Sequence, residues 1–517
     1  MAGLRTVPAD SRAVEKPTED QHVSSLVYGS REAAEGIKRF EMGEDEMPAQ
    51  NAARFIRDEL LMDGNPHMNL ASFVTTYMED EAEKLMMENL SKNFIDVEEY
   101  PAMGEIETRC VNMISRLFNA PLDDENSEAV GVSTVGSSEA CMLAVLAAKR
   151  RWQNKRRAEG KSTDKPNIVC SAAVQVVWEK AFRYFEVEEK YWYCRTGEYK
   201  MNPKEAVDLV DENTCLIVGI LGTTYTGQYE DILAMNDLLE EKNKKEGLDC
   251  RIHVDAASGG FVAPFVNPDL KWDFRVPLVA SINVSGHKYG LCYAGIGWAF
   301  WRSKEYLPEE ILFTVNYLGS PQVSFTLNFS KSGVQMLSQY YQLLRLGKSG
   351  YRAIMTNLTK VADYVADEVL DIKDQDGKPL FELMSEKSGE GLPLVAWRIN
   401  VEKPYDEFAI ASHLRQRGWI VPAYTMAPHC EKLKLLRVVV REDFTRSRAD
   451  TFLRDLRETV DFLEHAPKEV QDHFSKNQAG GDPSSKHHPA HHSKRHTVHH
   501  HEKHSLAGKY GKTHAVC

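Results

Sequence analysis

One stretch of the chain, residues 281–290, constrains the fold more than any other. An apolar run over residues 277–284 ends abruptly in Ser-Gly-His-Lys, which predicts a buried strand that opens into a tight loop. Lys288 would then lie at the end of a sheet, where burial favours the neutral, nucleophilic form of its amine. The ordinary interpretation of such a tetrapeptide is an exposed turn, so it does not identify a site alone.

A second strand pattern lies upstream, at residues 251–255, and ends in a carboxylate, Asp255, followed by small residues. An aspartate at this place is most simply a cap of the turn after the strand. A lysine that can form a Schiff base, together with an acid that can pair with a pyridinium nitrogen, is what pyridoxal 5'-phosphate (PLP) requires. Lys288 and Asp255, each at a strand end, therefore predict a PLP site.

A third segment predicts the place of the phosphate. Gly136, Ser137 and Ser138 run directly into a helical pattern at residues 141–149. Free N–H groups and the positive end of the helix dipole would complete an anion site there. The alternative, a serine cap with Glu139 near the third helical position, is compatible with the same role. The segment is not a P-loop, because no Gly-Lys-Ser/Thr follows.

Strand and helix patterns alternate through the middle of the chain. Residues 167–174 and 215–221 read as buried strands, and residues 232–245 as a helix, which predicts βαβ units and a mostly parallel α/β sheet. Ligands of such sheets bind beyond the carboxyl ends of the strands. The chemically interesting residues Gln175, Thr224, Asp255 and Lys288 all fall at those ends.

A smaller α+β domain is expected near the C-terminus. A long helical pattern at residues 332–370, interrupted near Gly347, leads into it. Its expected elements are strands at 392–399 and 435–440 and helices at 406–417 and 446–463.

Several motifs together resemble one family. Residues 132–143, 253–265 and 281–290 are similar to the three signature regions of PLP-dependent glutamate decarboxylases of bacteria, plants and fungi. The resemblance runs from about residue 55 to about residue 464. It includes Asp63-Gly64-Asn65-Pro66, Glu98-Glu99-Tyr100-Pro101, Thr224-Tyr225-Thr226-Gly227 and Tyr317-Leu318-Gly319.

The resemblance implies a type I PLP-dependent transferase fold, as in aspartate aminotransferase. It also implies a helical N-terminal oligomerisation segment at 1–65, a large PLP-binding domain at 66–345 and a small domain at 346–466. The assembly would be at least a dimer and up to a hexamer.

The resemblance also assigns site residues. Lys288, Asp255 and His287 would be catalytic, with His287 contacting the phosphate or positioning the substrate. Further cofactor contacts would be Ser137, Ser138, Gln175, Thr224, Ala257, Ser285 and, from the neighbouring subunit, Ser330. Substrate would contact Ser72, Phe73, Asn93, Asp96 and Arg437.

Gln175 and Arg437 also have simpler interpretations, and Asp96 has a consequence for pH dependence. Gln175 would cover one face of the PLP ring, although a polar cap at a strand end is its simpler role. Arg437 and Arg441 would alternate onto one strand face, where surface arginines are the default. Asp96 facing a carboxylate is unfavourable unless one of the two is protonated, which predicts better activity at acidic pH.

The implied reaction is the decarboxylation of L-glutamate to 4-aminobutanoate (GABA) and CO₂, with uptake of one proton per turnover. Two other classes stay open. The same fold supports aminotransferases and other amino acid decarboxylases, which release of a keto acid or a different amine would reveal. A non-catalytic scaffold acting through the tail is the second, and lack of cofactor absorbance would favour it.

Composition narrows the setting of this activity. A net charge of −13 argues against general nucleic-acid binding, and no apolar run approaches a membrane span. The nine cysteines contain no C-x-x-C pair, which suits reduced thiols in a cytoplasmic protein. No metal site is expected in the body of the chain.

The tail, residues 467–517, differs from the rest. Ten of the chain's 18 histidines lie between His487 and His514, among Pro, Ser and Lys, which predicts a disordered segment. It could be inert, bind metal, or dock on the acidic body when its histidines are protonated. Calmodulin binding is not expected, because the tail has no Trp and no apolar helical stripe.

Overall fold

The computed structural model describes residues 37–315, 322–467, 469–471 and 474. The chain divides into two units, Met1–Asn65 and the part from Pro66 onward, which are described separately. In the first unit, helix α2 (Ala49–Leu60) follows Pro48, and residues 37–48 form no helix. Proline fits the start of a helix but not its interior, so the helix begins directly after Pro48.

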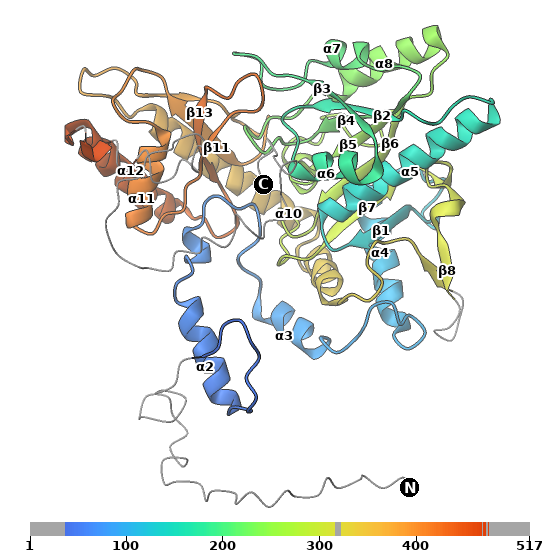
Figure 1. The fold of residues 1–517 in the computed structure, drawn as a ribbon, viewed down its shortest axis with the longest axis horizontal. Coiled ribbons are helices and arrows are strands. Elements are labelled where there is room, and N and C mark those ends of the chain that lie inside the picture. The colour runs from blue at the N-terminus through green and yellow to red at the C-terminus, as the bar shows by residue number, and fades with distance from the viewer. Residues whose placement is uncertain (1–36, 316–321, 468, 472–473, 475–517) are drawn as a thin grey trace, which may run out of the picture. The chain divides into compact units, whose positions relative to one another are not determined.

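The second unit is built around a seven-stranded sheet (Figure 1). Its spatial order is β1-β7-β6-β5-β4-β2-β3, in which β7 runs antiparallel to both neighbours and every other neighbouring pair is parallel. The strands are β1 (Val130–Thr134), β2 (Asn167–Ser171), β3 (Glu188–Trp192), β4 (Thr214–Ile220), β5 (Ile252–Asp255), β6 (Val279–Ser285) and β7 (Gly297–Trp301). The predicted, mostly parallel α/β sheet is confirmed.

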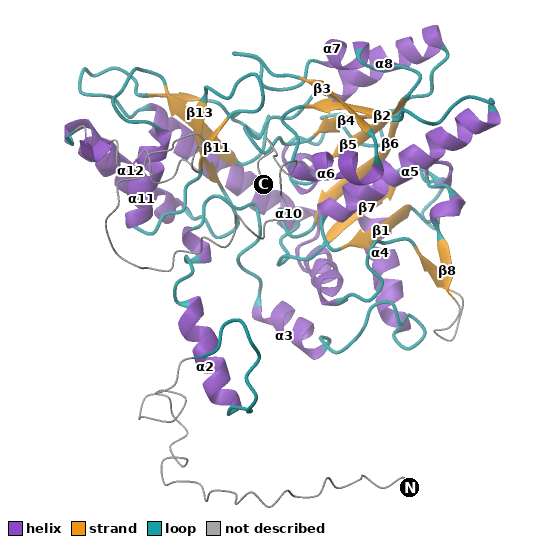
Figure 2. Cartoon of the chain, in the orientation of Figure 1, coloured by secondary structure: helices purple, strands orange, loops and turns teal. Residues whose placement is uncertain are grey.

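Helices bury both faces of this sheet (Figure 2). On β4, Leu216 and Val218 pack with helices α5 (Ser137–Ala158) and α6 (Val176–Phe185). Ile217 belongs instead to the main core, which also includes side chains of α4 (Pro101–Leu117), α8 (Ile232–Glu246) and α10 (Val334–Leu370). The near-continuous apolar strands are explained by this double cover. Shorter helices are α3 (Asp80–Glu88), α7 (Pro203–Asp208) and α9 (Ala263–Val266).

A second, four-stranded sheet is antiparallel throughout, in the order β10-β11-β13-β12. Helix α10 leads to it and is interrupted at Gly347, whose φ of 55° and ψ of −174° leave the helical region. The predicted break is therefore present. The elements are β10 (Phe381–Leu383), β11 (Leu394–Ile399), β12 (Ala423–Thr425), β13 (Lys434–Val439), α11 (Glu407–Gln416) and α12 (Arg446–His465), and a separate hairpin joins β8 (Phe313–Val315) to β9 (Gln322–Ser324).

Two sequence predictions concern residues that the structure does not describe. Most of the histidine-rich tail, and with it each of its three interpretations, lies outside the described residues, as does the Tyr317-Leu318-Gly319 motif. Among the helices that the structure does describe, none combines the length and the apolar character needed to cross a bilayer.

Candidate active site

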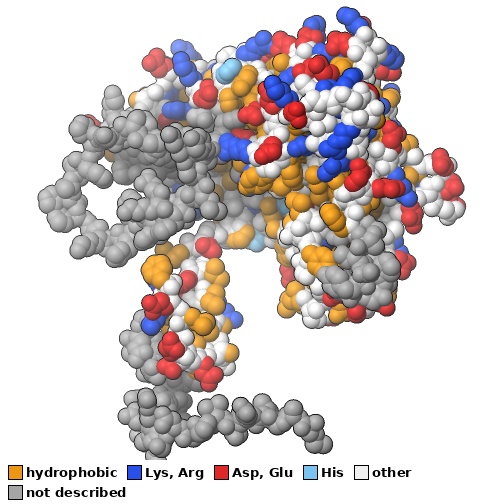
Figure 3. Space-filling view, turned by 45° about the vertical axis from the view of Figure 1, so that its right-hand side comes forward, with side chains coloured by type: hydrophobic (Ala, Val, Ile, Leu, Met, Phe, Trp, Pro, Cys, Tyr) orange, Lys and Arg blue, Asp and Glu red, His pale blue; other side chains and the backbone are white. Residues whose placement is uncertain are grey.

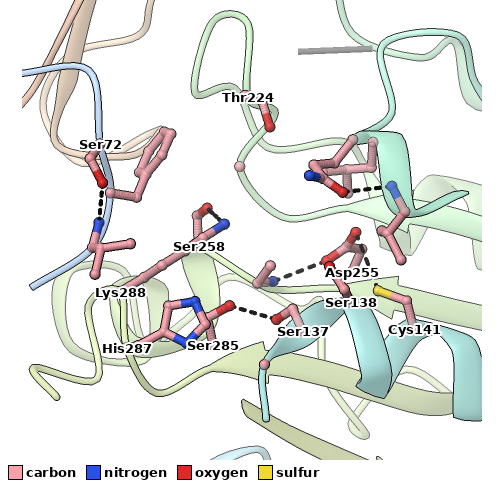
Figure 4. A pocket seen from close by; sticks show the side chains of 18 of the residues that line it. Ser72, Ser137, Ser138, Cys141, Thr224, Asp255, Ser258, Ser285, His287 and Lys288 are labelled. Atoms are coloured by element: carbon pink, nitrogen blue, oxygen red, sulfur yellow. Dashed lines mark hydrogen bonds between the residues drawn. The ribbon is translucent and has the colours of Figure 1, made fainter. Parts of the chain in front are cut away.

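A cavity of about 480 Å³ opens at the carboxyl ends of the parallel strands β4, β5 and β6 (Figure 4). This is the edge at which ligands of parallel sheets bind. Most of the predicted site residues line it: Ser72, Phe73, Ser137, Ser138, Gln175, Thr224, Asp255, Ala257, Ser285, His287 and Lys288.

Lys288 lies in the turn that follows β6. Its Nζ donates a hydrogen bond to Ser258 Oγ at 3.1 Å and lies 5.2 Å from the centre of the Phe73 ring. Burial lowers the pKa of Lys288, an effect that the charge of Asp255 partly opposes. A larger share of the amine is therefore neutral and nucleophilic than in an exposed lysine.

The backbone of this turn is held from outside the sheet. Thr75 Oγ1 donates to the carbonyl oxygen of Lys288 at 2.8 Å, and Thr75 N donates to the carbonyl oxygen of His287 at 3.0 Å. Two backbone carbonyls of the turn are thus satisfied by one residue of the segment that also carries Ser72 and Phe73. The lysine is consequently fixed on a rigid support.

Asp255 is the last residue of β5 and accepts three hydrogen bonds. Trp178 Nε1 donates to Oδ2 at 2.8 Å, while Asn283 Nδ2 and Ala257 N donate to Oδ1 at 3.0 and 3.2 Å. The Cys141 thiol lies 3.9 Å from Oδ2. N–H donors on both oxygens stabilise the anionic carboxylate, the form needed to pair with a protonated ring nitrogen.

The start of α5 forms the predicted anion cradle. Ser137 Oγ and Ser285 Oγ, from the helix and from β6, lie 2.6 Å apart. The serines are not the helix cap. Gly136 takes the N-cap position and no side chain caps the helix, while Glu139 Oε2 accepts from Val135 N at 2.8 Å. The hydroxyl of Ser138, and one of the two hydroxyl protons of the Ser137–Ser285 pair, therefore stay available to an anion.

Close backbone approach shapes the floor of this cradle. A Cβ atom on Gly297, the first residue of β7, would lie 2.5 Å from the backbone carbon of Gly136. Only glycine therefore lets β7 pass beneath the helix start.

His287 shows that the cradle fits a phosphate. Its Nδ1 is buried and has no hydrogen-bond partner in the described part of the chain. Burial, with the charge of Lys288 adding to it, lowers the pKa of His287 to about 4, so the ring is neutral. The orphaned nitrogen, the serine hydroxyls and the helix start together suit the phosphate of PLP.

Gln175 fulfils the simpler of its two expected roles, because its Oε1 accepts from Val177 N at 2.7 Å and caps α6. It also lines the cavity. The side chain of Gln175 therefore both caps α6 and lines the cavity.

Arg437 is not a surface arginine, and the default interpretation was wrong. It is 3% exposed, and its two terminal nitrogens donate to the carbonyl oxygens of Thr224 and of Ala71, the latter at 2.9 Å. Its guanidinium carbon lies 5.0 Å from the centre of the Phe73 ring. Arg437 thus borders the cavity behind Phe73 instead of lining it directly.

Arg441 also departs from expectation. Strand β13 ends at Val439, so the two arginines do not share a strand face, and Arg441 is 2% exposed. It donates to the carbonyl oxygens of Ser72 and Pro66, at 2.9 and 3.1 Å. Its contacts support the segment that carries Ser72 and Phe73.

Three predicted residues do not reach this cavity. Asn93 Nδ2 lies 3.4 Å from Asp96 Oδ1 and 3.4 Å from Ser330 Oγ, so the three side chains form a cluster of their own. None of them lines the cavity around Lys288. Within one chain, the structure brings the other predicted cofactor residues together but leaves Ser330, Asn93 and Asp96 outside the cavity.

Four contacts were missed by sequence reasoning. Ser258 and Thr75 bond the lysine and its turn, and Trp178 and Asn283 bond Asp255. Ser258 and Asn283 lie within the motifs that drew attention, and Asn283 is the residue opposite Asp255 in the β5–β6 register. For Trp178 and Thr75 the sequence carries no signal, since each acts from a separate element.

A family model described as the pyridoxal-dependent decarboxylase conserved domain matches residues 44–400. The chain belongs to the pyridoxal-dependent decarboxylase family. This family membership agrees with the lysine, the aspartate and the anion cradle, and the fold is accordingly the type I fold of PLP-dependent enzymes.

The relatives align with most of this chain. Glutamate decarboxylase 1 of Arabidopsis thaliana is 53% identical over 89% of each chain. The glutamate decarboxylase of Aliivibrio fischeri is 43% identical over 85% of this chain and 93% of its own. Among solved structures, the glutamate decarboxylase of Lactobacillus brevis is 40% identical, with a TM-score of 0.80 over 85% of this chain and 98% of the other.

Proposed function

We propose that this decarboxylase converts L-glutamate to 4-aminobutanoate and CO₂, with PLP bound covalently to Lys288. The observation that carries the proposal is the cavity that joins a partly neutralised lysine, a triply hydrogen-bonded aspartate and an anion cradle. The names of relatives that are 43–53% identical support glutamate as the substrate.

PLP, when bound, supplies an electron sink for the bond broken as CO₂ leaves. Asp255 would pair with the ring nitrogen, and its three N–H donors hold the carboxylate in place for that task. Ser258 orients the amine of Lys288. The neutral ring of His287, in the tautomer with its proton on the unpaired Nδ1, would donate a hydrogen bond to the phosphate.

Arg437 is the residue best suited to bind a carboxylate of the substrate. It is buried at the edge of the cavity, and no described carboxylate forms an ion pair with it. A buried, uncompensated guanidinium is costly, and a substrate carboxylate would remove that cost while gaining a charge-assisted hydrogen bond. Ser72 and Phe73 line the same side of the cavity.

The assembly we propose is at least a dimer in which Asn93, Asp96 and Ser330 complete the pocket of the partner. Their exclusion from the cavity of their own chain supports this arrangement. The first unit would assist assembly. Figure 3 shows hydrophobic side chains on its surface, and Ile56, Leu60, Leu61 and Met62 are 57–89% exposed.

We also propose that the seven-stranded and four-stranded sheets mark a large and a small domain, at 66–345 and 346–466, and that the enzyme is cytoplasmic. The buried free thiols of the described cysteines support a reducing compartment. Fractionation of the source cells would test the location: recovery with a secretory or organellar marker would contradict it.

The test of the reaction is the visible spectrum of the purified holoenzyme, followed by product analysis with L-glutamate. We expect a PLP absorption band that Lys288→Ala abolishes, and formation of CO₂ and 4-aminobutanoate in equal amounts. Ser258→Ala is the matched control. It removes a hydrogen bond of the Lys288 amine but leaves the lysine itself, so the PLP band should remain. A keto acid in place of CO₂ would make the enzyme an aminotransferase, and no band after addition of PLP would overturn the cofactor assignment.

A further inference from the structure

A ladder of polar side chains is buried beneath Asp255. In the register of β5 and β6, His253 lies opposite Ser281, and Asp255 lies opposite Asn283. The four side chains are between 0% and 6% exposed, whereas the neighbouring strand β4 is apolar after Thr214. Buried polar groups are retained when each is hydrogen-bonded, and here each is.

Three contacts connect the ladder. Ser281 Oγ lies 2.8 Å from His253 Nδ1, and His253 Nε2 lies 2.7 Å from Asn283 Oδ1. Asn283 Nδ2 then donates to Asp255 Oδ1 at 3.0 Å. The contacts form one continuous chain that ends on the carboxylate.

The direction of the chain follows from which atoms can donate. An ionised carboxylate only accepts, so Asn283 must turn its NH₂ group to Asp255 and its Oδ1 to His253. Oδ1 only accepts as well, so His253 carries its proton on Nε2. Burial holds the pKa of His253 below its usual value, so the ring is neutral and its Nδ1 accepts from the Ser281 hydroxyl. Every bond therefore donates toward Asp255.

We propose that His253 is a positioning residue, which fixes the amide of Asn283 so that an N–H always faces Asp255. Without the donor at Nε2, the amide is free to rotate and present its oxygen to the carboxylate, which would repel it. Loss of that donor weakens the hydrogen bond from Asn283 to Asp255 and hence the placement of the carboxylate against the ring nitrogen. This inference rests on the proposed role of Asp255 toward PLP.

A purely structural role is the competing explanation, because His253 also packs against Trp178 with ring centroids 5.5 Å apart. Glutamine separates the two roles. Its terminal amide can donate to Asn283 much as Nε2 does, but it is not aromatic. Phenylalanine keeps the ring and the packing but has no donor.

The experiment compares holoenzymes of His253→Phe and His253→Gln. The readouts are the dissociation constant for PLP, the visible spectrum of the bound cofactor, kcat, and KM for glutamate. His413→Phe is the matched control: His413 is also buried, and its Nδ1 lies 3.0 Å from a hydroxyl, Thr459 Oγ1, but it belongs to α11 and does not line the cavity.

We expect His253→Phe to weaken PLP binding and to lower kcat by about tenfold or more each, the value of a lost charge-assisted hydrogen bond. The spectrum should change, KM should stay within about twofold, and His253→Gln should restore most of each property. His413→Phe should leave all four unchanged. If His253→Phe does not fold, two other variants test the same chain of bonds. Ser281→Ala removes the donor to His253, and Asn283→Leu removes the donor to Asp255, so both holoenzymes should change the spectrum in the same direction.

Equal effects of His253→Phe and His413→Phe on PLP affinity and spectrum, or failure of His253→Gln to restore them, would overturn the proposal. Asp255→Asn separates this failure from failure of the proposed function. If Asp255→Asn changes the spectrum and PLP affinity while His253→Phe does not, only the role of His253 is wrong. If Asp255→Asn changes neither, the assignment of Asp255 itself is wrong.

Discussion

At the residue scale, two basic side chains dominate the electrostatics of the cavity. In the part of the chain that the structure describes, neither Lys288 nor Arg437 forms an ion pair, and burial lowers the pKa of both. Each charge adds to the cost of the other. Arg437 has no carboxylate partner among the described residues, so a carboxylate of the substrate would relieve part of the cost of its burial.

The substitution Arg437→Lys tests this view of the substrate. A lysine keeps the charge but loses the planar fork, so it cannot hold both backbone carbonyls and still reach a carboxylate. We expect KM for glutamate to rise by about tenfold or more, with a smaller change in kcat. Steady-state kinetics of the holoenzyme would measure both.

Arg441→Lys is the control, since Arg441 is equally buried and also bonds two backbone carbonyls, but makes no contact with the Phe73 ring of the kind that Arg437 makes. It should lower the melting temperature and leave KM within about twofold. An unchanged KM in Arg437→Lys would show that Arg437 is a structural residue only.

At the scale of elements, the end of β4 depends on a buried acid. Glu230 Oε2 accepts from Ile220 N at 2.7 Å, and its Oε1 accepts from Met201 N at 3.4 Å, so the side chain joins the strand to the start of another segment. Burial raises the pKa of Glu230 to about 8, which the two backbone donors only partly oppose. At neutral pH the folded protein therefore holds a proton on this group.

A pH-dependent stability follows. Between the ordinary value of 4.5 and about 8, folded Glu230 keeps a proton that the unfolded chain releases, so stability falls as pH rises through this window. The substitution Glu230→Gln removes the dependence. We expect the melting temperature of the wild type, relative to that of Glu230→Gln, to decline from pH 5 to pH 8. The corresponding loss in the free energy of unfolding is up to a few kcal/mol.

Thermal unfolding of both proteins at several pH values would measure this difference, in which other titrating groups cancel. Two curves that stay parallel across the window would show that Glu230 remains ionised in the folded protein.

Element positions were largely predictable, because the buried strands and the helices between them have clear periodic patterns. Strand β4, helix α8 and the break of α10 at Gly347 lie within a residue or two of expectation. The burial of Arg437 was not predictable, since a strand pattern does not show that both of its faces will be covered. The hydrogen bond from Trp178 to Asp255 was equally hidden, because it joins two elements that meet only in the folded chain.

At the scale of the whole molecule, the cluster of Asn93, Asp96 and Ser330 raises the question of which chain it serves. If it completes a partner's pocket, a Lys288→Ala subunit can lend an intact cluster to a subunit that lacks one. We expect Lys288→Ala and an Asn93→Ala/Asp96→Ala double variant each to be nearly inactive alone.

Refolding the two together should then recover activity. Random pairing makes half of the dimers mixed, each with one intact site of two, so about a quarter of the wild-type activity should return. A mixture of Lys288→Ala with Lys288→Arg is the control and should stay inactive. No recovery in the first mixture would show that the cluster serves the site of its own chain or takes no part in the reaction.

The segment around Thr75 has a mechanical consequence. Leu70 N donates to Ile420 O and Val439 N donates to Leu70 O, both at 2.9 Å, so the segment is fastened to the four-stranded sheet a few residues before Thr75 grips the turn of Lys288. The bonds of Leu70 join backbone atoms, and Thr75 bonds the turn through its backbone N–H as well as through Oγ1. A hinge rotation of the small sheet would therefore be transmitted to the lysine backbone, and opening the cavity and withdrawing the amine would be one movement.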